Sequence, residues 1–181
     1  MAWIFFGITQ LGDGIFVIFL CLILFFNSIK NSFIILMSYL FSSVISRVLK
    51  DLVFVNQYRP VKYFGDFGIT FKHLETVELY SFHSFPSGHT ITAFAVFGAL
   101  SFLFKTRKTQ SILGITAVLV AISRVYLGQH FVRDVAFGAF LGLLSTILLM
   151  KVLQIDKISN WLNEKMSFRL TKRFSKEKTT V

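Results

Sequence analysis

Residues 137–150 read FGAFLGLLSTILLM, a run without a charge or a turn signal. A second run, GIFVIFLCLILFF at residues 14–26, has the same character. With their flanks, both runs approach the about 20 apolar residues that a helix needs to cross a bilayer core. The whole chain is 54% hydrophobic and 15% charged, which is too apolar for an ordinary soluble domain. The sequence therefore predicts an integral membrane protein with several spans.

Apolar runs separated by polar breaks predict five spanning helices, at about 11–26, 33–53, 90–104, 111–126 and 135–153. The segment before residue 11 is either an interfacial helix or part of a sixth helix. It has no basic region or cleavage site typical of a signal peptide. We therefore expect one all-α, polytopic membrane helical bundle of five or six helices over residues 1–155. The remaining residues, 156–181, predict a basic cytoplasmic tail that starts as an amphipathic helix and ends in disorder.

The net charge of +10 is spread between and after the apolar runs, so it does not form the basic face of a nucleic-acid-binding protein. Twelve of the nineteen Lys and Arg residues fall on one side of the predicted bundle: Lys30, Lys105, Arg107, Lys108 and eight from Lys151 onward. The positive-inside rule makes that side cytoplasmic. We expect an inner (cytoplasmic) membrane protein whose opposite end faces the periplasm or the outside.

That outer end carries the one long predicted connection, at about 54–85. Three polar clusters converge on it: Lys50 with Arg59, Ser87 with His89, and Arg124 with His130 and Asp134. A charge near the bilayer centre costs about 2.5 to 3.5 kcal/mol or more. Charges at the ends of spans therefore need an aqueous pocket or a partner, and these clusters are candidates for a functional site.

His130 and Asp134 are four residues apart. If the fifth span begins near Gln129, the two side chains share a helix face, and the carboxylate can accept the imidazole N–H. This contact would orient the ring and leave its other nitrogen free as a nucleophile. The alternative is a solvated pair at a helix start, where an Asp is favoured by the helix dipole.

The stretch SFHSFPSGHTITAF, residues 81–94, places Pro, Ser, Gly and His in front of an apolar run. Backbone N–H groups at a helix start, the Ser87 hydroxyl and the close approach that Gly88 allows are suited to a phosphate. His89 would then exchange a proton with a leaving oxygen or water. The alternative is a capped helix with an incidental His. Similarly, Lys50, Arg59 and Arg124 are suited to phosphoryl oxygens, or else extend to lipid headgroups.

In order, the chain shows KDLVFVNQYRP from Lys50, PSGH ending at His89, and SRVYLGQHFVRD ending at Asp134. These resemble the three-part signature of the type 2 phosphatidic acid phosphatase superfamily. The second and third parts match in full. In the first part eight residues separate Lys50 from Arg59, where the family has six. Two extra residues rotate a side chain by about 200 degrees on an unbroken helix, so the helix must end before Arg59, as Pro60 favours.

The resemblance implies a bundle of the acid phosphatase and vanadium haloperoxidase type, and a two-step phosphoryl transfer without metal or cofactor. It implies that His130 is the nucleophile, that Asp134 holds its ring, and that His89 protonates the leaving group and then activates water. It implies a phosphoryl-binding set of Lys50, Arg59, Ser87, Gly88 and Arg124.

The implied substrate is a phosphomonoester or pyrophosphate of a membrane lipid: undecaprenyl pyrophosphate, phosphatidylglycerophosphate, phosphatidate or a lipid A phosphate. The lipid bilayer is the expected partner, with no nucleic acid and no obligatory protein. Two alternatives remain open: a lipid phosphotransferase with the same site, and a non-catalytic lipid-binding or transport protein. Separately, the GAFLG pattern from Gly138 to Gly142 predicts close helix packing within the domain.

Overall fold

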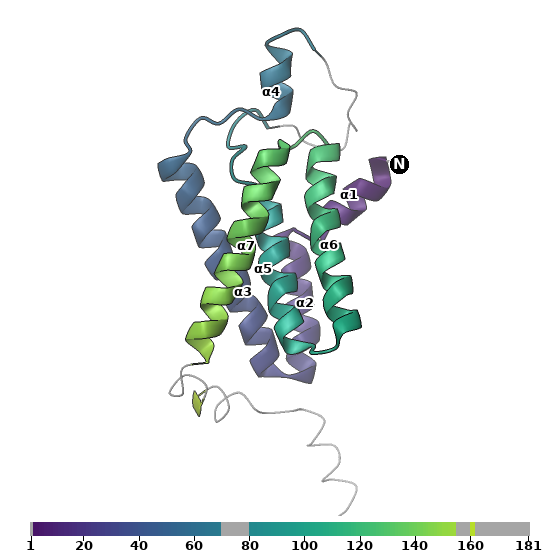
Figure 1. Cartoon of the computed structure of the whole chain (residues 1–181), viewed down its shortest axis with the longest axis vertical. Helices are drawn as coiled ribbons and strands as arrows, with labels where there is room; N and C mark the ends of the chain where they lie inside the picture. Colours follow the sequence, from purple (N-terminus) through teal and green to yellow (C-terminus); the bar gives the residue numbers. More distant parts are fainter. Residues whose placement is uncertain (1, 70–79, 155–159, 162–181) are drawn as a thin grey trace, which may run out of the picture.

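The fold was analysed in a computed structural model that describes residues 2–69, 80–154 and 160–161. The elements run in the order α1 (Ala2–Gln10), α2 (Gly14–Asn27), α3 (Ile29–Val48), η1 (Leu49–Val53), α4 (Pro60–Gly65), α5 (Gly88–Leu103), α6 (Arg107–Tyr126) and α7 (Val132–Leu153) (Figure 1). The predicted all-α bundle is confirmed. The amphipathic tail expected at 156–181 lies outside the described residues, apart from residues 160–161.

Among the described residues, three helical segments are long and apolar enough to cross a membrane: α3 with η1, α6 and α7. The pair α1 and α2 passes the same test as one span, bent by 54° at a short break. The shorter apolar helix α5 lies among them (Figure 1). The five predicted spans fall on α2, α3 with η1, α5, α6 and α7, but only three of these segments qualify alone as spans in the described part of the chain: α5 is too short, and α2 qualifies only together with α1. The segment left open in the sequence is a separate helix, α1.

Polar residues at the breaks start the helices that follow them. Asp13 accepts the N–H of Ile15 at 2.8 Å and begins α2. In the same way Ser28 begins α3 and Thr106 begins α6, each accepting a backbone N–H three residues ahead. Such caps satisfy N–H groups that have no partner inside the helix. The short polar breaks of the sequence therefore become the turns of the bundle.

Helix α5 is the centre of the bundle and packs against α3, α6 and α7. Helix α7 comes close to it because two glycines face α5. A Cβ on Gly142 would lie 2.6 Å from the carbonyl oxygen of Ile91, and one on Gly138 would lie 3.0 Å from that of Ser87. The prediction that the GAFLG pattern packs helices within the domain is confirmed. This packing sets the first turn of α7 beside the first turn of α5.

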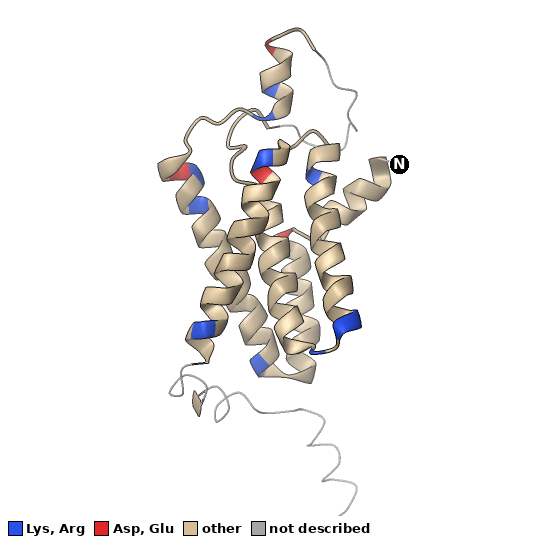
Figure 2. Cartoon of the chain, viewed as in Figure 1, with Lys and Arg blue, Asp and Glu red and all other residues tan. Residues whose placement is uncertain are grey.

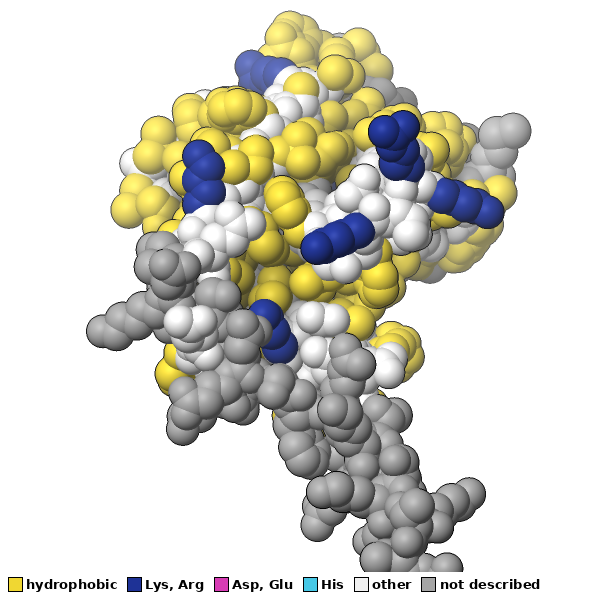
Figure 3. Space-filling model, turned by 60° about the horizontal axis from the view of Figure 1, so that its bottom comes forward, with side chains coloured by type: hydrophobic (Ala, Val, Ile, Leu, Met, Phe, Trp, Pro, Cys, Tyr) yellow, Lys and Arg dark blue, Asp and Glu magenta, His cyan; other side chains and the backbone are white. Residues whose placement is uncertain are grey.

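The two ends of the bundle differ in charge. The start of α3, the α5–α6 connection and the end of α7 lie together at the lower end in Figure 1. These segments carry Lys30, Lys105, Arg107, Lys108 and Lys151. Figure 2 shows this charge at the helix ends, and Figure 3 shows the same end with Lys and Arg in view but no acidic side chain among the described residues. The three polar clusters of the sequence all belong to the opposite half.

Candidate active site

His130 lies in the short connection between α6 and α7, and Asp134 is the third residue of α7. The helix starts at Val132, so the expectation that both residues share a helix face is wrong. The connection is tight instead: the N–H groups of Gln129 and His130 both donate to the carbonyl of Arg124, at 3.0 and 3.3 Å. This turn brings His130 Nδ1 to 3.7 Å from Asp134 Oδ2.

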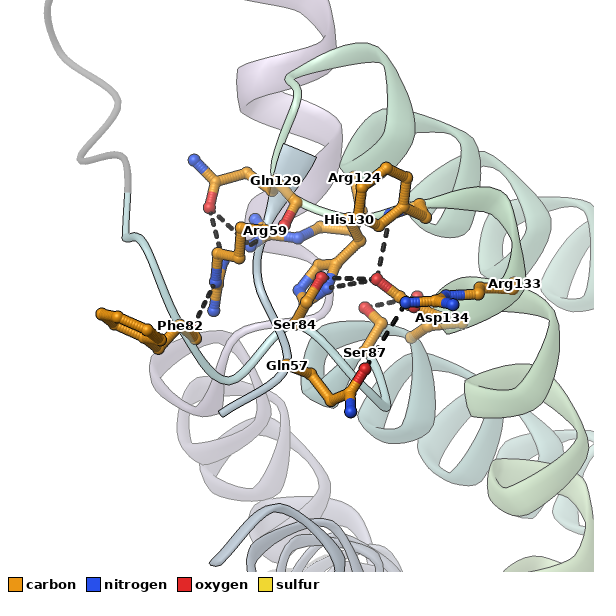
Figure 4. Close-up of polar contacts among 12 residues, drawn as sticks. Gln57, Arg59, Phe82, Ser84, Ser87, Arg124, Gln129, His130, Arg133 and Asp134 are labelled. Carbon is orange, nitrogen blue, oxygen red and sulfur yellow. Dashed lines mark hydrogen bonds and ion pairs between the residues drawn. The ribbon is translucent and has the colours of Figure 1, made fainter. Parts of the chain in front are cut away.

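The Asp134 carboxylate is fully buried, and Arg133 Nε donates to its Oδ1 at 3.4 Å. Its Oδ2 accepts the backbone N–H of Phe131 at 3.0 Å and the hydroxyl of Ser84 (Figure 4). The 3.7 Å to His130 Nδ1 exceeds hydrogen-bond length, so the expected imidazole hydrogen bond is replaced by a longer electrostatic contact. The carboxylate still favours the tautomer with its proton on Nδ1. The lone pair of Nε2 is then free to react.

Burial sets the charge of the His130 ring, whose side chain is 2% exposed. Loss of hydration lowers the pKa of His130 to about 3, against the opposing effect of Asp134. The ring is therefore neutral near pH 7. A neutral imidazole has the lone pair that a nucleophile needs.

A stability measurement tests this protonation state. An unfolded His titrates near pH 6.5, whereas His130 in the fold titrates at about pH 3. The unfolded chain therefore binds the proton first, and the wild type should lose stability as pH falls from about 6.5 towards 4. The variant His130→Gln lacks this titration, so its melting temperature should fall less over the same range. Parallel melting curves for the two proteins would contradict the lowered pKa.

Two buried guanidinium groups lie beside this pair. Arg59 Nη1 donates to Gln129 Oε1 at 2.7 Å, and Arg124 Nη2 lies 3.5 Å from the same oxygen (Figure 4). Arg59 Nε donates to the carbonyl of Phe82 at 3.0 Å. Gln129 therefore holds the two cations at one point, next to His130 in the chain.

The guanidinium groups are short of negative charge. Arg59 is 9% exposed and Arg124 is 8% exposed. Burial lowers the pKa of Arg59, which is the sign expected for a cation that has lost its hydration. Among the described residues, Arg124 Nε has no hydrogen-bond partner. A buried cation cluster of this kind is suited to an anion with several oxygens.

Lys50 reaches the same region despite its wider spacing from Arg59. It lies in η1, a π-helical turn in which Phe54 N–H donates to the carbonyl of Leu49 at 2.7 Å. The helix ends at Val53 and Arg59 is extended before Pro60, as predicted. Lys50 Nζ lies 3.7 Å from the point that a Cβ would take on Gly88. The wide turn thus places the amine beside the PSGH segment.

The first turn of α5 carries the remaining predicted residues. Ser87 is fully buried and sits at the cap position, but its side chain makes no capping bond. Its Oγ accepts from Thr90 Oγ1 at 3.0 Å, and its N–H donates to the carbonyl of Asp134 at 3.1 Å. Gly88 and His89 follow and line a cavity of about 330 Å³ together with Lys50. The alternative of a simple serine-capped helix does not describe this arrangement.

The chain matches a known protein family over most of its length. Residues 31–157 match the family profile described as the PAP2 superfamily. The chain belongs to the PAP2 superfamily. PAP2 is the type 2 phosphatidic acid phosphatase group that the three sequence motifs resemble, so that prediction is confirmed. Together with its phosphatase relatives, this membership identifies the chain as a membrane phosphatase, a hydrolase of phosphoester bonds.

Individual PAP2 relatives cover most of the chain. Phosphatidylglycerophosphatase B of Bacillus subtilis is 36% identical over 152 residues, which are 76% of this chain and 68% of the relative. Lipid A 1-phosphatase of Rhizobium johnstonii is 32% identical over 135 residues, 71% of this chain and 53% of that protein. The crystal structure of Aquifex aeolicus LpxE superposes with a TM-score of 0.69 at 29% identity, covering 83% of this chain and 85% of that one.

Four residues of this PAP2 site were not found from the sequence. Ser84 contacts Asp134, Gln129 bridges the guanidinium groups, Thr9 Oγ1 accepts from Arg124 Nη1 at 3.0 Å, and Asp13 Oδ2 lies 3.7 Å from His89 Nε2. Ser84 stands just before PSGH and Gln129 lies within SRVYLGQHFVRD, so their positions offered a weak signal. Thr9 and Asp13 lie far from any motif and offered none.

A metal was not expected at this PAP2 site. Within the described ranges no group of three or more His, Cys, Asp or Glu residues is placed to hold a metal ion. Metal independence stays a prediction, and the assay described below includes a chelator to test it.

Proposed function

We propose that the protein removes a phosphate group from a membrane lipid by way of a phosphohistidine at His130. The observation that carries this proposal is the buried neutral ring of His130 between Asp134 on one side and the charges of Arg59 and Arg124 on the other. A nucleophile, an orienting carboxylate and cations for an anionic substrate are thus gathered in one place.

In the first step Nε2 of His130 attacks phosphorus while the bond to the lipid oxygen breaks. His89 gives its proton to that oxygen, and the lipid alcohol or lipid phosphate leaves. In the second step His89 takes a proton from water, the water oxygen attacks phosphorus, and the N–P bond breaks. Asp134 stabilises the positive ring during both steps because it lies beside Nδ1.

The phosphoryl group would be bound by Lys50, Arg59 and Arg124, with the Ser87 hydroxyl and the Gly88 N–H. The cations favour the charge that spreads over the phosphoryl oxygens in the transition state. The Ser87 oxygen already accepts from Thr90, which leaves its own hydrogen to donate. This set takes the role that a metal ion has in other phosphoryl-transfer enzymes.

A lipid substrate is supported by the position of the site inside a multi-span bundle and by the printed names of the relatives. In Figure 1, α5 begins deeper in the bundle than the adjacent ends of α6 and α7. A phosphate at lipid headgroup level would meet this depth. The basic end of the bundle supports a cytoplasmic assignment for that end and an outward-facing pocket. We assign residues 1–155 to the catalytic domain and 156–181 to a cytoplasmic tail.

A panel of lipid phosphates tests this function. The purified protein in detergent, with EDTA, is given phosphatidylglycerophosphate, phosphatidate, undecaprenyl pyrophosphate and lipid A. We expect phosphate release from at least one, with kcat/KM at least about tenfold above that for p-nitrophenyl phosphate, because lipid contacts add binding energy in the transition state. Phosphate release is measured by colour assay.

Two controls accompany the panel. His130→Ala reports background, and Asp66→Asn changes an exposed carboxylate that pairs with Lys62 on α4, away from the site. Failure to release phosphate from every substrate, or dependence on an added divalent cation, would contradict the proposal. Adding a lipid or sugar acceptor separates hydrolysis from phosphotransfer, since a transferase would label the acceptor in place of water.

A further inference from the structure

The break between α1 and α2 is packed directly onto the first turn of α5. A Cβ on Gly12 would lie 2.8 Å from the carbonyl oxygen of His89 and 2.9 Å from a methyl carbon of Val120. Any larger residue would therefore force the break away from α5. On α1, Thr9 Oγ1 accepts from Arg124 Nη1 at 3.0 Å. Two independent contacts thus join the N-terminal segment to the catalytic end of the bundle.

Asp13 in this break uses its two carboxylate oxygens differently. Oδ1 accepts the N–H of Ile15 at 2.8 Å, which caps α2 and fixes the direction of the side chain. Oδ2 lies 3.7 Å from His89 Nε2. The side chains of Asp13 and His89 are 35% and 31% exposed, and both line the 330 Å³ cavity that Lys50 also reaches. Catalytic contacts of this length often shorten when substrate binds.

His89 also has a cationic environment. The groups that act on it electrostatically are Lys50 of η1, Arg59 before α4, Arg124 of α6 and His130. These three basic side chains oppose a further positive charge on the imidazole. The proposed first step nevertheless requires His89 to carry a proton to the leaving oxygen. A nearby negative charge would satisfy that requirement.

We propose that Asp13 is a positioning residue for His89, which orients the imidazole and supplies the negative charge that lets it carry its proton beside the three cations. The inference rests on the proposed function, in which His89 is the proton donor. The site then contains two carboxylate–histidine pairs, Asp134 with the nucleophile and Asp13 with the acid. Asp13 lies before residues 31–157, which match the family profile. It is therefore a candidate site residue outside the three-part signature.

The competing explanation is that Asp13 only caps α2. Asn and Ser cap helices about as well as Asp. Asp13→Asn keeps the cap and the side-chain size but removes the charge. Asp13→Ser keeps the cap but is too short to reach His89. Both variants should therefore melt close to the wild type, and a role in catalysis can be measured apart from a role in folding.

The test compares two leaving groups. With the best lipid phosphate of the panel, the leaving alkoxide or phosphate needs the proton of His89, and Asp13→Asn should lower kcat/KM by about 10- to 100-fold. With p-nitrophenyl phosphate, the nitrophenolate leaves without a proton, and the loss should stay below about threefold, because kcat/KM reports only the steps up to expulsion of the leaving group. Asp13→Ser should show the same ratio, and Asp66→Asn should match the wild type on both substrates.

The possible outcomes separate the inference from the function on which it rests. Equal losses on the two substrates would show a general structural effect and overturn the role for Asp13, as would full activity of Asp13→Asn on the lipid. If the wild type is active, His130→Ala is inactive and Asp13→Asn is unchanged, the inference alone falls. If the wild type releases phosphate from neither substrate, both proposals fall.

Discussion

His130→Ala is expected to abolish turnover, with kcat reduced by at least about 10⁴-fold. The reason is that the proposed covalent intermediate forms on the His130 ring. The His130 ring is buried and neutral, its Nδ1 lies 3.7 Å from Asp134, and its Nε2 is left to attack. His89, in contrast, has its Nε2 towards Asp13. Phosphate release from the best lipid of the panel measures the effect. In the wild type, denaturation during turnover should trap acid-labile phosphate on the protein, and the variant should trap none.

Loss of folding would imitate this result, because deleting a buried ring leaves a cavity that costs about 3 kcal/mol or more. His130→Asn fills more of the space and should be equally inactive, with a melting temperature nearer the wild type. Vanadate, a phosphate mimic that accepts five ligands, should inhibit the wild type and bind these variants weakly. Activity near the wild-type level in either variant would sink the assignment of the nucleophile.

Asp134→Asn is expected to lower kcat by about 10³- to 10⁴-fold while the protein stays folded. The amide oxygen can still accept from Ser84 and from Phe131 N–H, so both structural bonds are kept. The negative charge beside His130 Nδ1 is lost, however, and the ring can no longer be stabilised as it becomes positive. The measurement is kcat on the lipid substrate together with a melting curve.

Ser84→Ala is the matched control for this variant. It removes one hydrogen bond to Asp134 but leaves the charge, so a loss of about tenfold is expected, in line with one hydrogen bond. Asp134→Asn should therefore lower kcat far more than Ser84→Ala does. Equal losses in the two variants would mean that Asp134 acts only by holding the loop before α5, and its proposed electrostatic role would be wrong.

The bundle itself was predictable because its causes are local. Each predicted span is a run of apolar residues, and α2, α3 and α6 begin at the capping residues Asp13, Ser28 and Thr106. The order and spacing of the three motifs also predicted the family. The early end of the helix before Arg59 followed from Pro60 and from the two extra residues after Lys50.

Local spacing failed where the backbone left the regular helix. His130 and Asp134 were expected to meet on a helix face, whereas a turn outside α7 brings them together. Lys50 reaches Gly88 from η1, which is a π-helical turn. The sequence around Lys50 contains no pattern from which we predicted that turn. A rotation of 100 degrees per residue is a rule for α-helices alone.

The membrane bundle and the residues of the PAP2 signature could be predicted from the chain before folding, because spans depend on apolar runs and motifs on fixed spacing. The residues that complete the candidate site could be found only in the folded molecule. Ser84 is 50 residues from Asp134, Gln129 is 70 from Arg59, and Thr9 is 115 from Arg124. Such pairs meet because α5, α6 and α7 pack at one end and the α1–α2 break docks against them. Packing of this kind depends on the whole shape of the bundle, so it cannot be predicted from a local sequence pattern.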